Sequence, residues 1–137
     1  MEIQAKLLTE MSFAIETDSG YHVILDTNDA DAKEAAHPCP TELLLVALAG
    51  CMGMSLTTIL NKMKQPPLTY EIHVQATKKQ RPPYTFETIR LEHILSGQKL
   101  EASAIQRALT LAEERYCAVG LMLKEAINVT HTFRIVI

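Results

Sequence analysis

Cys51 is the first residue whose type and surroundings indicate chemistry. It lies in the middle of a predicted helix, with Gly50 and Gly53 beside it. A glycine inside a helix costs about 1 kcal/mol relative to alanine, so two of them beside one thiol require a reason. Close approach of another helix or of a substrate would be such a reason. The alternative is that Cys51 is a small core residue and the glycines merely let a neighbour pack tightly.

Cys117 follows the predicted end of a second helix and opens a short third one. A thiol at a helix N-terminus has its thiolate stabilised by the helix dipole, and Arg115 adds to this effect if its side chain turns the same way. Such a thiol is suited to thiol–disulfide exchange. The alternative is that Cys117 is a buried structural thiol. The chain has 3 cysteines, and an odd number points to reactive thiols or metal ligands rather than to a disulfide scaffold.

The third cysteine, Cys39, stands two residues after His37, and both side chains can reach a metal ion. Zinc sites usually assemble four such ligands, and the sequence offers no second close pair, so we expect no metal and no other cofactor. We interpret Cys39 as an incidental thiol at a helix entrance. Histidines in the predicted strands are expected to be ordinary sheet residues rather than catalytic bases: His22, His73, His93 and His131.

The N-terminal part alternates apolar and polar residues with the period of a half-buried strand. The alternating segments are residues 2–8, 11–17 and 21–26. Asp18-Ser19-Gly20 supplies a turn, so we predict an antiparallel meander. The connector from Thr27 to Cys39 is too poor in apolar residues to belong to a core, and we expect it to be a surface loop.

A long helix is predicted from Pro40 to about Lys64. Proline is tolerated at the first helical position, and Glu42 in the first turn complements the helix dipole. Residues 43–54 are apolar on nearly every face, so they must be buried on all sides, and a second subunit is the simplest way to complete that burial. This apolar stretch is about half of the roughly 20 residues that cross a bilayer, so we interpret it as a core helix and expect no membrane association.

The remaining chain predicts a second set of strands and two more helices. Strands are expected at residues 69–78, 84–95 and 129–137, and helices at residues 101–116 and 117–126. The order βββ-α-ββ-α-(α)-β indicates an α+β fold of antiparallel strands with a central buried helix. A length of 137 residues fits one domain, 1–137.

Charge and the N-terminal sequence exclude some classes of function. The net charge is −3 and the basic residues are scattered, so there is no electrostatic basis for nucleic-acid binding. The N-terminus lacks the basic start and apolar block of a signal peptide, and we expect a cytoplasmic protein.

Two motifs occur together in this chain. One is Pro40-Thr41-Glu42-Leu43-Leu44-Leu45 leading to Leu48-Ala49-Gly50-Cys51, and the other is Tyr116-Cys117-Ala118-Val119 after the second helix. As a pair they resemble the OsmC/Ohr family of osmotically induced and organic hydroperoxide resistance proteins, and the order of elements matches over nearly the whole chain. The resemblance implies an intertwined homodimer with the central helices of both subunits at its core.

The resemblance also implies a thiol peroxidase acting on a small-molecule peroxide. Cys51 would attack the hydroperoxide as a thiolate and become a sulfenic acid. Cys117 would then condense with it to a disulfide, which an external dithiol reduces. A resolving thiol protects the sulfenic acid from further, irreversible oxidation.

The first departure from the family pattern concerns an arginine. Peroxidatic members carry one on the N-terminal meander that stabilises the thiolate, whereas the first arginine of this chain is Arg81. Lys6, Arg115 or a residue of the other subunit is left for that role. The missing arginine favours a rival function, a non-catalytic protein that binds a small ligand in an apolar pocket around Cys51, Met52 and Met54 on the same dimeric scaffold.

The second departure concerns a glutamate. Peroxidatic members place it directly after the helix-starting proline, where this chain has Thr41, and Glu42 follows one step later. Nine residues separate Glu42 from Cys51, which corresponds to about 13 Å along a straight helix and to opposite sides of it. Glu42 would therefore meet only the Cys51 of another subunit, or serve the helix dipole alone. The pattern looks like a less characterised OsmC-like branch.

Overall fold

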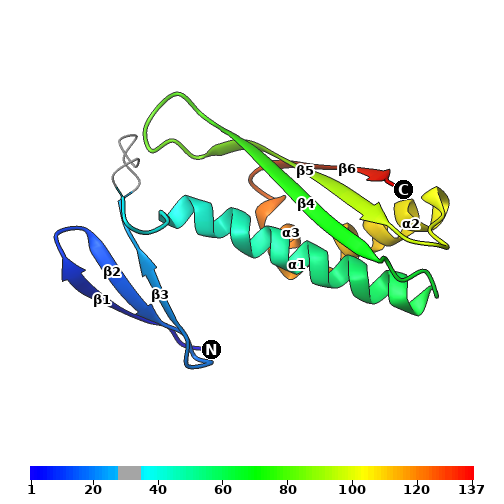
Figure 1. Cartoon of the computed structure of the whole chain (residues 1–137). Coiled ribbons are helices and arrows are strands. Elements are labelled where there is room, and N and C mark those ends of the chain that lie inside the picture. Colours follow the sequence, from blue (N-terminus) through cyan, green and yellow to red (C-terminus); the bar gives the residue numbers. More distant parts are fainter. Residues whose placement is uncertain (28–34) are drawn as a thin grey trace. The chain divides into compact units, whose positions relative to one another are not determined.

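The structure, a computed structural model, describes residues 1–27 and 35–137 (Figure 1). The chain divides into two compact units, Met1–Val46 and Ala47–Ile137, and each contains one three-stranded sheet. The predicted surface loop between Thr27 and Cys39 lies largely outside the described residues. The single domain predicted from chain length stays a prediction.

The first unit contains the predicted meander. Its strands are β1 (Gln4–Thr9), β2 (Ser12–Glu16) and β3 (His22–Leu25), paired antiparallel in the order β1-β2-β3. The turn between β2 and β3 is closed by a hydrogen bond from the Thr17 backbone N–H to the Tyr21 carbonyl, 2.8 Å long. Gly20 in this turn has a φ of +90°, a conformation that glycine adopts at little cost.

The long helix α1 (Pro40–Lys62) begins and ends close to the predicted positions. Cys39 precedes its first turn, and its backbone N–H donates to Glu42 Oε1 over 3.3 Å, which is the backward half of a capping box. The helix stops before Lys64, whose φ of +60° is left-handed.

By its length and composition, α1 could be either a membrane-spanning helix or a core helix. Its 23 residues include an 18-residue window of mean hydropathy 2.1, which would suffice to cross a membrane. Length and composition alone therefore fit both a membrane-spanning helix and a core helix. Packing supports a core helix instead, because one ridge of α1 in the second unit is buried at helical spacing: Leu48, Met52, Leu56 and Leu60.

The second unit holds the sheet β4-β5-β6, formed by β4 (Thr69–Lys78), β5 (Phe86–Ser96) and β6 (Asn128–Ile135). The strands β4 and β5 are antiparallel, as predicted, but β5 and β6 are parallel. The chain leaves β5 and returns through a helical crossover, which brings it back in the same direction. The expectation of purely antiparallel strands is therefore wrong for β6, while the α+β fold with a long central helix is confirmed.

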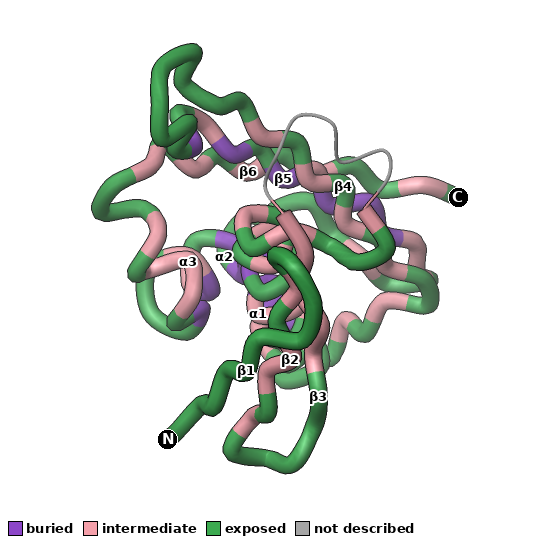
Figure 2. Tube along the Cα trace, turned by 90° about the vertical axis from the view of Figure 1, so that its left-hand side faces the viewer, coloured by how far each residue is buried: buried purple, intermediate pink, exposed green. Residues whose placement is uncertain are grey.

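The crossover consists of α2 (Ala102–Leu111), the π-helical turn η2 (Ala112–Tyr116) and α3 (Ala118–Leu123). The predicted second helix thus covers α2 and η2, and its last turn is widened. The core of this unit lies between the helices and the inner face of β5, and Figure 2 shows buried residues along both. Its fully buried side chains include Ile89, Leu91, Leu95, Ile105, Ala108 and Ala112.

Candidate active site

Cys51 and Cys117 come together in the second unit. Cys51 is carried by α1, and Cys117 is the residue that precedes α3. The two thiols lie close enough that Cys51 raises the pKa of Cys117, and both cysteines are free. Two residues far apart in the sequence are therefore brought together.

Cys117 is fully buried, and its surroundings oppose ionisation. Burial is the main cause that raises the pKa of its thiol to about 11, and the neighbouring Cys51 thiol raises it further. The Gly120 backbone N–H donates to Cys117 Sγ over 3.3 Å and lowers this pKa, but by less. The expectation of a stabilised Cys117 thiolate is wrong, because desolvation outweighs the favourable helix N-terminus. Arg115 is exposed and is not among the groups that shift this pKa.

The environment of Cys51 differs because this thiol is only half-buried. A Cβ added at Gly50, the residue before Cys51, would meet no atom of the described residues within 4 Å apart from its chain neighbours and the backbone of its own helix. A Cβ at Gly53 would lie 3.2 Å from Ile72 Cδ1 and 4.0 Å from Tyr70 Cε1. The missing side chain of Gly53 therefore lets Ile72 and Tyr70 of β4 pack close to α1. In the described part of the chain, no such packing occurs at Gly50.

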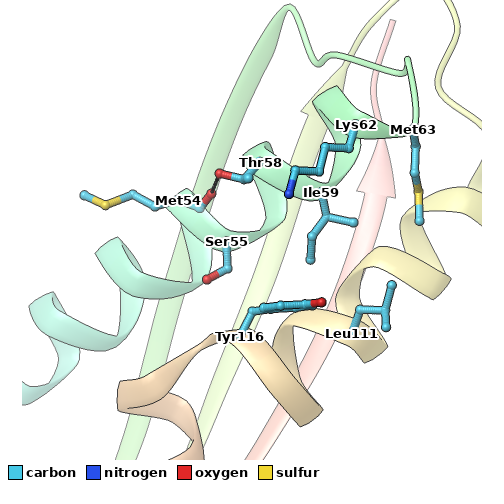
Figure 3. Close-up of a pocket in the computed structure, with 8 residues that line it drawn as sticks. All are labelled: Met54, Ser55, Thr58, Ile59, Lys62, Met63, Leu111 and Tyr116. Atoms are coloured by element: carbon cyan, nitrogen blue, oxygen red, sulfur yellow. Dashed lines mark hydrogen bonds between the residues drawn. The ribbon is translucent and has the colours of Figure 1, made fainter.

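A pocket of about 460 Å³ opens along α1 and faces the crossover (Figure 3). It is lined by Met54, Ser55, Thr58, Ile59, Lys62, Met63, Leu111 and Tyr116. Ser55 follows Cys51 by one helical turn on the same side of α1, and Tyr116 directly precedes Cys117. The pocket thus adjoins both segments that carry the thiols, but neither cysteine is among its lining residues. The sequence predicted a pocket around Cys51, Met52 and Met54, but Met52 is only 1% exposed and belongs to the core.

The pocket walls are mainly apolar, with a few polar groups at defined places. Figure 3 shows the Lys62 ammonium reaching over the pocket and the Tyr116 ring facing Ile59 from the opposite wall. The Thr58 hydroxyl donates to the Met54 carbonyl over 2.8 Å, so its proton is already engaged. No acidic side chain is among the lining residues. Such a pocket can hold an organic molecule with a polar end.

Glu42 has a local partner at the start of α1, where it accepts the hydrogen bond from Cys39 described above. This contact supports a capping role for Glu42. Cys39 Sγ lies 3.5 Å from Thr41 Oγ1, also within this first turn. Lys6, a candidate for the role of the missing arginine, lies on β1 of the first unit. Among residues 1–27 and 35–137, no three His, Cys, Asp or Glu side chains gather in a way that could hold a metal ion.

Sequence reasoning missed a chain of three hydrogen-bonded rings on the inner face of the second sheet. Tyr70 Oη lies 2.6 Å from His93 Nδ1, and His93 Nε2 lies 3.0 Å from His131 Nδ1. His93 is the only fully buried polar side chain in the described part of the chain. The signal was present, because Tyr70, His93 and His131 all occupy inward-facing positions of neighbouring strands.

Comparison with known proteins places the chain in a family. A family model described as OsmC-like protein matches residues 30–132. Protein YhfA of Escherichia coli (strain K12) is 32% identical over 99% of this chain and 98% of its own length. The chain therefore belongs to the family of OsmC-like proteins.

Solved structures share the fold at lower identity. An OsmC-like protein from Mycoplasma pneumoniae superposes with a TM-score of 0.84 at 16% identity, covering 99% of this chain and 96% of that one. The organic hydroperoxide resistance protein OhrB of Bacillus subtilis gives a TM-score of 0.68 at 17% identity, covering 97% and 96%. These likenesses show that the arrangement of helices and strands is that of the OsmC/Ohr fold.

Proposed function

We propose that this protein is a thiol-dependent reductase of organic hydroperoxides that serves in peroxide or stress resistance. The observation that carries the proposal is the proximity of the Cys51 and Cys117 thiols, which are close enough for Cys51 to raise the pKa of Cys117. Membership of the OsmC-like family supports it, as does the name of the B. subtilis neighbour, an organic hydroperoxide resistance protein.

The different burial of the two thiols supports different roles. Cys51 is only half-buried, which leaves part of this residue open to a peroxide. Cys117 is fully buried and its raised pKa keeps it protonated at neutral pH, so it is a poor first nucleophile. We therefore assign the attack on the peroxide to Cys51 and the resolving step to Cys117.

The first step transfers one oxygen atom. The Cys51 thiolate attacks the terminal oxygen of R–O–O–H, the O–O bond breaks, and Cys51 becomes a sulfenic acid, S–OH. The alkoxide leaving group takes a proton and departs as the alcohol ROH. Cys51 has been oxidised by two electrons and the peroxide reduced by two.

The second step joins the two sulfurs. The sulfur of Cys117 attacks the Cys51 sulfur, the S–O bond breaks, and the hydroxyl leaves as water with the proton of the Cys117 thiol. An external dithiol then reduces the disulfide through thiol–disulfide exchange and returns both cysteines to the starting state. The proximity of the two thiols before oxidation supports this step.

The apolar pocket supports an organic substrate rather than hydrogen peroxide. Its wall along this stretch of chain extends from Met54 to Met63, the residue after the end of α1. A hydrocarbon group that enters this pocket loses contact with water, at a gain of roughly 25 cal/mol for each Å² of apolar area buried. Hydrogen peroxide has no such group and gains nothing from the pocket.

The test is disulfide formation in the purified protein. One equivalent of cumene hydroperoxide should convert two of the three thiols into a Cys51–Cys117 disulfide, identified by mass spectrometry of nonreduced peptides. Cys39→Ser is the matched control and should form the same disulfide. Cys117→Ser should stop at a sulfenic acid on Cys51, which dimedone traps, and Cys51→Ser should consume no peroxide. A protein that leaves all thiols reduced in excess cumene hydroperoxide would refute the proposal.

A second candidate function is binding of a small apolar ligand without catalysis. It is favoured by the pocket of about 460 Å³ and by the absence of any arginine before Arg81. Cys51→Ser separates the two functions. A binding protein would retain the affinity of the wild type for a fluorescent naphthalene sulfonate probe after this change, and the wild type would show no peroxide turnover.

We also propose a homodimer in the cytoplasm. Large apolar side chains of α1 stay exposed in the single chain, with exposed fractions of 61% for Val46 and 74% for Met54. The helix predicted to be buried on all sides thus leaves an apolar surface that a second copy can cover. The fold is the small soluble type of its family, and a reducing compartment suits thiols that must be regenerated.

A further inference from the structure

Gly120 occupies an interior position of the short helix α3, where glycine is a poor choice. Replacing an alanine by glycine inside a helix costs about 1 kcal/mol, so a local reason for the glycine is expected. A Cβ at this position would lie 3.1 Å from Cys117 Sγ, 3.6 Å from Cys117 Cβ and 3.6 Å from Leu48 Cδ1. The first of these separations is tighter than an ordinary van der Waals contact. The Cys117 sulfur therefore occupies space that the Cβ atom of any other residue at position 120 would need.

The backbone of Gly120 also holds the same sulfur. Its N–H donates to Cys117 Sγ over 3.3 Å, so the sulfur fills the role of a capping group for α3. The same thiol lies close enough to Cys51 for Cys51 to raise its pKa. The Cys117 backbone is fixed as well, because its N–H donates to the Ala112 carbonyl over 2.8 Å across the π-helical turn.

We propose that Gly120 is a positioning residue for the thiol pair. Its missing side chain leaves room for the Cys117 sulfur, and its backbone N–H anchors that sulfur where it meets Cys51. This inference rests on the proposed function, because the step that Gly120 would assist is the attack of Cys117 on the Cys51 sulfenic acid. In that step the S–S bond forms, the S–O bond breaks and water leaves.

The principal test compares Gly120→Ala with Gly50→Ala. Both changes add one methyl group to a helix close to one of the two cysteines. The methyl at position 120 meets the Cys117 sulfur at 3.1 Å, whereas at position 50 no atom of residues 1–27 and 35–137 beyond the chain neighbours and the helix's own backbone lies within 4 Å. Gly120→Ala should slow the conversion of the sulfenic acid to the disulfide by about tenfold or more, since a displacement of about 1 Å in a reacting group can cost up to 100-fold in rate. Gly50→Ala should retain the wild-type rate.

A further readout separates positioning from a general loss of structure. In the Cys117→Ser background, Gly120→Ala should leave the rate of Cys51 sulfenic acid formation unchanged, because the only close contact of the added methyl group with the residues described, at 3.1 Å, is with the Cys117 sulfur. In the Cys39→Ser, Cys51→Ser background, the pH profile of Cys117 alkylation should move to higher pH with Gly120→Ala, since the hydrogen bond that favours the thiolate is weakened. The alkylation profile needs no peroxide, so it tests the placement of the sulfur even if the peroxidase proposal fails.

A measurement on the unmodified protein covers the case in which Gly120→Ala does not fold. The chain contains only 5 glycines, so labelling with 15N-glycine gives few amide signals. The Gly120 signal should shift strongly when diamide oxidises the dithiol, while that of Gly20 should not move. The inference is overturned if Gly120→Ala resolves at the wild-type rate with an unchanged alkylation profile, or if the Gly120 amide does not respond to oxidation.

Discussion

His93 Nε2 and His131 Nδ1 lie 3.0 Å apart, so two histidines share one hydrogen bond in the core of the second unit. A shared bond requires one ring to donate and the other to accept, which fits two neutral rings in complementary tautomers. Burial, followed by the neighbouring His131, lowers the pKa of His93 to about 4. Burial also lowers the pKa of His131, although Glu113 opposes this shift.

This pair predicts a loss of stability in acid. Histidines in the unfolded chain bind a proton near pH 6.5, while folded His93 binds one only near pH 4. The unfolded state thus holds more protons between these values, so the free energy of unfolding falls as the pH drops from about 6.5 toward 4. The loss for His93 alone is on the order of 3 kcal/mol.

Urea denaturation at several pH values between 4 and 8 measures this loss. His93→Gln should flatten the pH dependence, because glutamine does not titrate, and it should also destabilise the protein at neutral pH. The matched control is His73→Gln, since His73 is exposed on the outer face of the same sheet. Identical pH slopes for wild type and His93→Gln would contradict the prediction.

The thiols are predicted to differ in reactivity. At pH 8, Cys117 should react with iodoacetamide far more slowly than Cys39, because Cys117 is fully buried with a pKa of about 11, whereas Cys39 is half-buried. Peptide mass spectrometry at increasing times gives the two rates. In urea the difference should vanish. Labelling of native Cys117 as fast as that of Cys39 would show that the thiol is not enclosed.

The two glycines beside Cys51 should respond differently to a larger side chain. Valine has the same low helix propensity at both positions, but at position 53 it would press on Ile72 Cδ1, only 3.2 Å from the Cβ position. Gly53→Val should therefore lower the free energy of unfolding by about 1–3 kcal/mol more than Gly50→Val. Chemical denaturation compares the two variants directly. Equal losses would mean that β4 does not approach α1 at Gly53.

The proposed dimer predicts that charges on α1 separate the subunits. Val46→Glu and Met54→Glu each place a carboxylate on the exposed apolar surface of this helix, where burial against a second copy would be costly. Sedimentation equilibrium should give a dimer for wild type and a monomer for these variants. Leu68→Glu is the control, since Leu68 is 72% exposed outside α1 and should leave the dimer intact. A monomeric wild type at micromolar concentration would exclude the dimer.

The pocket predicts a change in substrate preference. Leu111→Trp should fill part of the pocket and lower kcat/KM for cumene hydroperoxide by about tenfold, because the lost burial of an aromatic group is worth on the order of 1–2 kcal/mol. The kcat/KM for hydrogen peroxide should change little, since that molecule needs no pocket. A peroxidase assay coupled to dithiol oxidation measures both values. Equal losses for the two peroxides would mean that the pocket does not bind the substrate.

Periodicity along the chain determined most of the elements. The two-residue alternation predicted the strands of both sheets, and the apolar run bounded by Pro40 and Pro66 predicted α1 nearly to the residue. These features could be predicted because each depends on residues close together in sequence. The parallel pairing of β5 with β6 could not, since strand direction depends on how the crossover between them folds back.

The candidate site likewise combines features that the sequence predicted with features that only the tertiary structure decided. The sequence alone identified Cys51 and Cys117, because each stands in a local pattern that a single stretch of chain displays. Tertiary structure decided that the buried Cys117 has a raised pKa, that Gly120 leaves room for its sulfur, and that a pocket lies along α1. It also joined Tyr70, His93 and His131. Desolvation, close contact and cavity shape depend on which distant segments meet, and a linear order of residues does not contain that information.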